Sequence, residues 1–171
     1  MLFRSIYSLN TTNTDFYAYQ FKPVLQFLDS PCKGILIADE VGLGKTIEAG
    51  LIWTELTARQ DARHLLVVCP AMLCQKWQDE LKNRFGIQAE IRNVQGVKKL
   101  IELIRKGDVE ETVTIASMQG LRKLAAQDGA ETGYWQDLEI EDTVFDLIII
   151  DEAHYLRNPQ TLTEVEIGRA S

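Results

Sequence analysis

Short apolar runs alternate with stretches of helical periodicity along most of the chain. Runs that are apolar on both faces, and that helices separate, are typical of strands in a parallel sheet covered on both sides. The strands predicted in this way are residues 34–39, 64–69, 112–116 and 145–150, with a further short one at 88–92. The pattern predicts a three-layer α/β sandwich with a mainly parallel sheet.

Between these runs, apolar side chains recur every three or four residues, which predicts amphipathic helices. In one of them Leu73, Trp77, Leu81 and Phe85 are spaced four apart. The predicted helices are residues 45–60, 72–85, 94–105 and a short one near 119–126.

One segment, residues 127–143, fits neither pattern. It holds six acidic residues, two glycines and the isolated aromatic pair Tyr134 and Trp135. We expect a surface excursion before the last strand, with the aromatic pair either packed back on the domain or exposed as a partner site.

Length and composition bound the protein class. A chain of 171 residues with 46% hydrophobic and 25% charged residues predicts a globular domain, not a disordered or collagen-like chain. No apolar run reaches the roughly 18 residues of a membrane span, and the first residues do not resemble a signal peptide. We therefore expect a cytoplasmic protein without a membrane partner.

The three cysteines do not form a disulfide pattern, because their number is odd and their spacing irregular. His64, Cys69 and Cys74 are spaced five apart, which differs from the close ligand pairs of zinc sites. Ordinary buried thiols in a reducing compartment are the preferred interpretation.

Charge is unevenly distributed along the chain. The net charge is −7, which by itself is not typical of a nucleic-acid-binding domain. Residues 1–107 carry 14 basic and 11 acidic residues, whereas residues 108–171 carry 4 and 14. The acidic total therefore belongs to the second part of the chain, and the first part is slightly basic.

A candidate phosphate-binding loop follows the first predicted strand and opens a helix, which is the context such a loop requires. Glycines let several backbone N–H groups point inward, Lys45 can contact phosphates, and the Thr46 hydroxyl can bind Mg²⁺. The strict pattern has glycine where this chain has Asp39, so a plain glycine-containing turn is the alternative. The candidate nucleotide-binding residues here are Gly42, Leu43, Gly44, Lys45, Thr46 and Ile47.

An acidic pair follows the most apolar predicted strand. A carboxylate at the carboxyl end of a buried parallel strand lies where ligands bind in such sheets. Asp151 is a candidate Mg²⁺ ligand, and Glu152 can orient or deprotonate the attacking water. His154 can sense the γ-phosphate, although it can also be an ordinary residue at a helix start.

Four blocks of the sequence together resemble the first RecA-like lobe of superfamily-two helicases, and more narrowly the Swi/Snf-type (DEAH box) ATPases. The run 46–52 is similar to the bacterial branch that includes RNA-polymerase-recycling ATPases. The family's phosphate loop begins with Asp, as here. The blocks are residues 39–46, 65–80, 113–119 and 151–154, the last followed by Arg157 and Asn158.

The resemblance implies a P-loop NTPase lobe that uses ATP and Mg²⁺, with Lys45, Asp151 and Glu152 as catalytic residues. Gln20 stands where the family places an adenine-reading glutamine, before a helix that begins near Pro23; a solvated glutamine is the alternative. The implied nucleic-acid contacts are Pro70, Gln75 and Ser117, which can also be ordinary helix and loop residues.

The resemblance also implies partners that the sequence does not contain. Family members have a second RecA-like lobe, and their first lobe continues into a strand that lies between the phosphate-loop strand and the acidic-box strand. We expect a lead-in at residues 1–18 and an ATP-binding lobe at 19–171 that is incomplete at its C-terminus. Without the missing strand, the sheet is expected to have a gap beside the phosphate-loop strand.

Three functions are compatible with these motifs. The first is the ATP-binding lobe of a motor that moves along nucleic acid, DNA rather than RNA, with little turnover by the chain alone. The second is a non-catalytic nucleotide-binding or partner-binding module. The third, a small nucleotide kinase, is disfavoured because residues 124–171 contain just two arginines, Arg157 and Arg169, too few for the usual lid.

Overall fold

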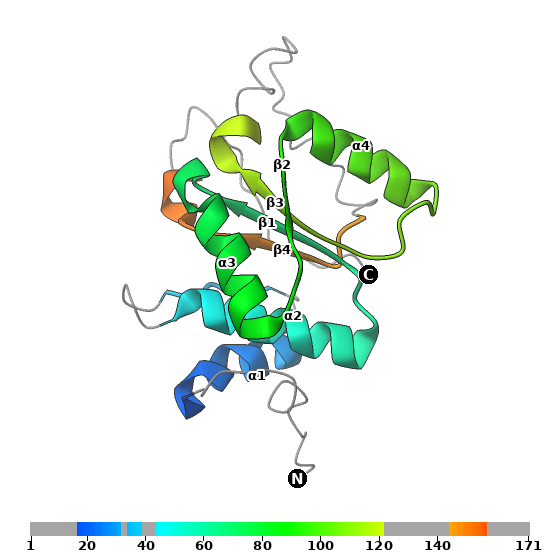
Figure 1. Cartoon of the computed structure of the whole chain (residues 1–171). Helices are drawn as coiled ribbons and strands as arrows, with labels where there is room; N and C mark the ends of the chain where they lie inside the picture. The colour runs from blue at the N-terminus through cyan, green and yellow to red at the C-terminus, as the bar shows by residue number, and fades with distance from the viewer. Residues whose placement is uncertain (1–16, 32–33, 39–43, 122–143, 157–171) are drawn as a thin grey trace.

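The computed structural model describes residues 17–31, 34–38, 44–121 and 144–156 (Figure 1). The helices are η2 (Ala18–Phe21), α1 (Lys22–Asp29), α2 (Lys45–Gln60), η3 (Ala71–Leu73), α3 (Cys74–Phe85), α4 (Val94–Arg105) and η5 (Ala153–Leu156). The strands are β1 (His64–Cys69), β2 (Glu90–Arg92), β3 (Thr112–Ser117) and β4 (Leu147–Ile150). None of the helices in these ranges is both long enough and apolar enough to cross a membrane.

The described strands form one parallel sheet in the order β2-β3-β1-β4. β1 therefore lies between two partners, with Cys69 beside Ser117 and Val68 beside Ile150. Because all the strands run in one direction, their carboxyl ends meet at the same edge of the sheet.

Side chains of β1 alternate between two cores. Leu65, Val67 and Cys69 pack in a cluster with α1, α2 and α3. Leu66 and Val68 pack on the other face in a cluster with α4. Figure 1 shows α4 on the side of the sheet opposite to α1 and α2. The predicted three-layer α/β sandwich with a parallel sheet is confirmed.

Most predicted elements are present with close boundaries. The helices predicted at 45–60 and 94–105 have those bounds, and the helix predicted at 72–85 is η3 followed by α3. Pro23 lies in the first turn of α1, as predicted, where its missing N–H costs no hydrogen bond. Residues 118–121 are helical, whereas residues 122–126 and 127–143 lie outside the described residues.

The strand predicted at residues 34–39 is wrong for its described part, because residues 34–38 have no regular secondary structure. A strand needs a neighbour that pairs with its N–H and C=O groups. β4 ends the described sheet, and no described strand lies between it and this segment. The predicted burial holds for one face alone, since Ile35 and Ile37 pack against the core, whereas Leu36 is 80% exposed.

Asp146 anchors the amino ends of two strands. Its Oδ2 accepts hydrogen bonds from the backbone N–H groups of Arg63, at 2.7 Å, and His64, at 2.8 Å. Its own N–H donates to the carbonyl of His64 at 2.8 Å. The charged residue that interrupts the most apolar run therefore ties β4 to the start of β1.

We predict that Gly50→Ala destabilises the fold. A Cβ at this position of α2 would lie 2.4 Å from the ring of Phe85, at the end of α3. Alanine gains about 1 kcal/mol of helix propensity over glycine, but overpacking costs about 1–3 kcal/mol. Denaturant unfolding should show a lower free energy of unfolding, and Gly50→Ala combined with Phe85→Leu should recover it. Stabilisation by Gly50→Ala alone would contradict this contact.

We also predict that His64 makes stability depend on pH. Burial lowers its pKa more than nearby Asp146 raises it, and Arg63 lowers it further. The unfolded chain therefore binds a proton more readily than the folded one. The free energy of unfolding should fall as the pH drops through about 6.5, the ordinary histidine value, towards the lower folded pKa. Melting temperatures measured over this range should change less for His64→Gln than for the wild type.

Candidate functional site

The carboxyl edge of the sheet gathers residues from three of the sequence blocks. Pro70 follows β1, Ser117 ends β3, and Asp151 follows β4. Because β1 pairs with both other strands, these residues come from neighbouring strand ends. In Figure 1 the N-terminus of α2 and η5 lie on this same side of the molecule.

α2 begins directly after a glycine with a left-handed backbone. Gly44 has a φ of +96°, a left-handed conformation that L side chains rarely adopt. The N–H groups of Ile47 and Glu48 donate to the Gly44 carbonyl at 2.7 and 3.0 Å. Lys45 and Thr46 precede them in the first turn, where N–H groups have no intrahelical acceptor and the helix dipole is positive. Gly42 and Leu43 lie outside the described residues.

Gln20 lies against this helix start. Its side-chain Oε1 accepts a hydrogen bond of 3.1 Å from the Tyr17 N–H. Its Nε2 would be 2.7 Å from a Cβ placed on Gly44. Gln20 is 3% exposed, so it is not the solvated glutamine that the sequence left as an alternative. The fold therefore brings Gln20 into contact with Gly44, a residue of the predicted phosphate-binding loop.

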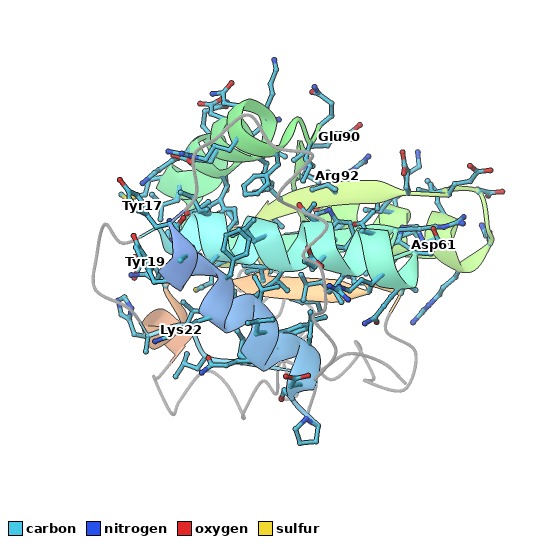
Figure 2. The ribbon with its side chains drawn as sticks, turned by 90° about the horizontal axis from the view of Figure 1, so that it is seen from below. Tyr17, Tyr19, Lys22, Asp61, Glu90 and Arg92 are labelled. Atoms are coloured by element: carbon cyan, nitrogen blue, oxygen red, sulfur yellow. The ribbon has the colours of Figure 1, made fainter. Side chains whose placement is uncertain are left out.

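Two exposed tyrosines lie beside Gln20. The rings of Tyr17 and Tyr19 stack with their centroids 5.6 Å apart and an angle of 13° between planes. Figure 2 places both at the end of the molecule opposite to Asp61, which caps the far end of α2. Both rings therefore lie at the end where α2 begins.

The acidic pair sits in a tight turn after β4. The Asp151 N–H donates to the Val68 carbonyl at 2.9 Å and so continues the pairing of β4 with β1. Glu152 has a φ of +55°, an uncommon conformation for a residue with a side chain. His154 Nδ1 lies 3.1 Å from Glu152 Oε2, which brings two predicted site residues into contact. Arg157 and Asn158 lie outside the described residues.

Trp77 contributes a contact that we did not predict. Its indole Nε1 donates a 2.8 Å hydrogen bond to Asp151 Oδ2, and the ring is 4% exposed. The sequence placed Trp77 on the buried face of a helix and in the block 65–80, but gave no sign of its partner. The two residues are far apart in the chain, so this contact follows from the tertiary packing.

The predicted nucleic-acid residues are held by local contacts. Pro70 is buried, and Gln75 is exposed with its amide bonded to side chains one turn later on α3. The Ser117 hydroxyl accepts a bond from a backbone N–H at 3.1 Å. Gln119 adds a bridge that we did not predict, because its Oε1 accepts from the Ala71 N–H at 2.9 Å. The turns after β1 and β3 are thereby joined.

The described cysteines are buried free thiols, as predicted. Cys69 and Cys74 Sγ atoms are 3.6 Å apart, and burial raises the pKa of the Cys69 thiol. His64 lies at the other end of β1 from Cys69, about 16 Å away for a strand of this length, so the three residues do not converge. Cys32 lies outside the described residues.

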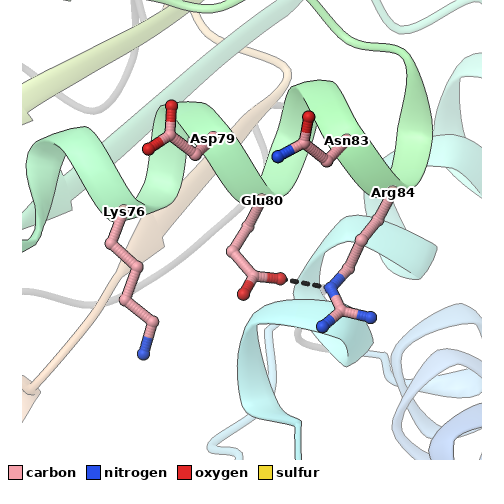
Figure 3. Close-up of a pocket in the computed structure, with 5 residues that line it drawn as sticks. All are labelled: Lys76, Asp79, Glu80, Asn83 and Arg84. Atoms are coloured by element: carbon pink, nitrogen blue, oxygen red, sulfur yellow. Dashed lines mark hydrogen bonds and ion pairs between the residues drawn. The ribbon is translucent and has the colours of Figure 1, made fainter.

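A shallow hollow follows the exposed side of α3 (Figure 3). It is lined by both signs of charge, and Glu80 and Arg84 form an ion pair within it. None of the residues predicted to bind nucleotide or nucleic acid lines it. The lining residues are Lys76, Asp79, Glu80, Asn83 and Arg84.

The arrangement fits a nucleotide with Mg²⁺ in two respects. The start of a long helix supplies first-turn N–H groups and the positive end of the helix dipole, which suit a phosphate group. A carboxylate at the carboxyl edge supplies the oxygen ligand that Mg²⁺ prefers. Lys45 and Thr46 would contact the phosphates and the ion, and Asp151 would hold the ion's coordination shell.

Comparisons with known proteins identify the family of this chain. The SNF2-related domain family matches residues 19–168. The RNA polymerase-associated protein RapA of Stutzerimonas stutzeri (strain A1501) is 30% identical over 154 residues, which are 89% of this chain and 15% of that protein. The uncharacterized ATP-dependent helicase YqhH of Bacillus subtilis (strain 168) is 32% identical over 126 residues, 74% of this chain and 19% of that protein. The chain thus spans less than a fifth of the length of these relatives.

A solved structure has the same fold. The Sulfolobus solfataricus SWI2/SNF2 ATPase core in complex with dsDNA matches with a TM-score of 0.61 and 22% identity, over 88% of this chain and 29% of that one. The predicted resemblance is confirmed: the chain belongs to the SNF2-related domain family and has the fold of a RecA-like lobe of the Swi/Snf-type helicases.

Proposed function

We propose that this chain is the ATP-binding part of a Swi/Snf-type motor that couples ATP hydrolysis to movement along double-stranded DNA. The observation that carries the nucleotide-binding part is the contact between Gln20 and Gly44. It joins the residue proposed to read adenine to the start of the helix proposed to bind phosphates. Such a junction serves a ligand with a base at one end and phosphates at the other.

The proposed roles follow from the chemistry of each side chain. Lys45 and the first N–H groups of α2 bind the phosphates. The Thr46 hydroxyl and Asp151 would hold Mg²⁺, which would supply neutralisation of the phosphate charge. Glu152 orients and deprotonates the attacking water, and its contact with His154 holds its carboxylate in place. Gln20 reads the adenine edge after its bond to the Tyr17 N–H rearranges.

The nucleic-acid part of the proposal is supported by Pro70 and Ser117, which lie at neighbouring strand ends, and by Gln75, which is exposed in the first turn of α3. Backbone N–H groups and small polar side chains can hold DNA phosphates without a high net charge. The solved structure with this fold is described as a complex with dsDNA, which favours DNA as the partner. The match to RapA, an RNA polymerase-associated protein, favours association with RNA polymerase for the whole protein.

A complete motor also needs the second RecA-like lobe that the family resemblance implies. An arginine finger from such a lobe can accelerate hydrolysis by about 10³- to 10⁵-fold. The chain alone should therefore bind ATP and hydrolyse it slowly. Turnover at the speed of a complete motor would contradict this view, and partner binding that is independent of nucleotide would favour the non-catalytic module.

We predict that Lys45→Ala weakens the binding of a fluorescent ATP analogue in the presence of Mg²⁺. Losing one hydrogen-bonded charge costs about 1.5–3 kcal/mol, so the dissociation constant should rise about 10- to 100-fold. Lys76→Ala is the matched control, because Lys76 is an exposed lysine on α3 that lines a hollow containing none of the predicted nucleotide-binding residues. Equal affinities for wild type and Lys45→Ala would argue against a phosphate site at α2.

We predict that Glu152→Gly separates stability from catalysis. A residue with a side chain loses about 1–2 kcal/mol of stability in the left-handed conformation, and glycine avoids this strain. Glycine also loses more backbone entropy on folding, so the free energy of unfolding should stay the same or rise by up to about 1 kcal/mol. Loss of the base should slow single-turnover hydrolysis of radiolabelled ATP by about 10²- to 10⁴-fold.

Asp61→Gly is the control for this experiment. Asp61 has a φ of +54°, close to the +55° of Glu152, but it caps the C-terminal end of α2, whereas the proposed phosphate site is at the N-terminal end. The two variants should have similar unfolding free energies, and Asp61→Gly should hydrolyse ATP as the wild type does. If Glu152→Gly also kept the wild-type rate, Glu152 would not be the catalytic base.

A further inference from the structure

The hydrogen bond between Trp77 and Asp151 joins α3 to the acidic pair. Its length of 2.8 Å is normal for a strong bond from an indole N–H to a carboxylate. Trp77 is 4% exposed and packs in the core cluster shared by α1, α2 and α3. The donor is therefore fixed by the packing of its ring and is not a mobile surface group.

Asp151 is held at two points as a result. Its backbone N–H is bonded to the Val68 carbonyl, which fixes the main chain at the end of β4. The terminal torsion of an aspartate is broad, so the main chain alone does not fix the two carboxylate oxygens. The indole bond to Oδ2 fixes them, and Oδ1 remains the oxygen that Trp77 does not engage.

We propose that Trp77 is a positioning residue that sets the orientation of the Asp151 carboxylate for Mg²⁺. This inference rests on the proposed function of Asp151. Partners that orient a metal-binding carboxylate raise metal affinity, because the ligand then loses no rotational freedom on binding. In this proposal Trp77 acts through Asp151 and does not itself bind the ion or the nucleotide.

A structural role alone is the competing explanation. A buried indole N–H needs an acceptor. In this explanation Asp151 accepts the bond to stabilise the buried Trp77, and the bond has no effect on how Asp151 binds Mg²⁺. The two explanations differ in the expected Mg²⁺ dependence. A structural role lowers the melting temperature but leaves the Mg²⁺ requirement of the folded protein unchanged.

The test is Trp77→Phe, which keeps an aromatic ring and removes the N–H. Binding of a fluorescent ATP analogue is titrated with Mg²⁺, and separately measured in EDTA. The Mg²⁺ concentration for half-maximal binding should rise about 10-fold, the lower end of the 10- to 100-fold range for such partners. The metal-free affinity for the nucleotide should stay at the wild-type value.

Trp53→Phe is the matched control. Trp53 is also buried, at 5% exposure, but it lies on α2 and has no part in the proposed site. It should lower stability to a similar degree and leave the Mg²⁺ titration unchanged. An equal shift in both variants would show that loss of a buried indole, and not of the bond to Asp151, is responsible.

Benzothienylalanine incorporated at position 77 covers the case in which Trp77→Phe does not fold. It has the shape of tryptophan with sulfur in place of the N–H, so the same shift in Mg²⁺ dependence is expected. Asp151→Asn combined with Trp77→Phe should bind Mg²⁺ no worse than Asp151→Asn alone. An additive loss would mean that Trp77 acts elsewhere.

Two negative results have different meanings. If the wild type binds nucleotide in a Mg²⁺-dependent way and the position-77 variants match it, the positioning role is overturned while the proposed function stands. If the wild type itself shows no Mg²⁺-dependent nucleotide binding, the proposed function and this inference both fail.

Discussion

Parallel pairing of β1 with both β3 and β4 is the constraint on which the rest of the structure depends. A central strand of this kind is buried on both sides, so β1 is apolar on both faces, and each face packs into one of the two cores. It also brings the turns after three strands to one edge. Residues from distant sequence blocks meet there because their strands are neighbours and run in the same direction.

Helix positions and the fold class could be predicted because apolar periodicity is a local property of the sequence. The segment 34–38 shows the limit of that approach. Ile35 and Ile37 pack against the core as their apolar character indicates, but the exposure of Leu36 is not readable from the sequence, and strand formation depends on a hydrogen-bonding neighbour. The motif residues of the site could be named from their spacing. The bond from Trp77 to Asp151 could not, since it depends on how α3 packs against β4.

The proposed site combines a residue that hydrogen bonds hold in place with residues that have an uncommon backbone conformation. Asp151 is fixed by its backbone bond and by the indole, whereas the next residue, Glu152, has an uncommon left-handed backbone. Gly44 also has a positive φ, but glycine has no side chain and therefore no steric strain in this conformation. Conformations of this kind persist where the surrounding packing holds them, and they are concentrated at functional sites.

The anchoring of β4 by Asp146 has a consequence at the opposite edge. Side chains alternate faces along a strand, so a slip of β4 by one residue would exchange every inward and outward position. Such a slip would bring Ile150 or Glu152 to the place that Asp151 occupies beside the indole. The paired bonds from Asp146 to Arg63 and His64 oppose that slip. A carboxylate at the far end of the sheet thus selects which of two adjacent acidic residues faces Trp77.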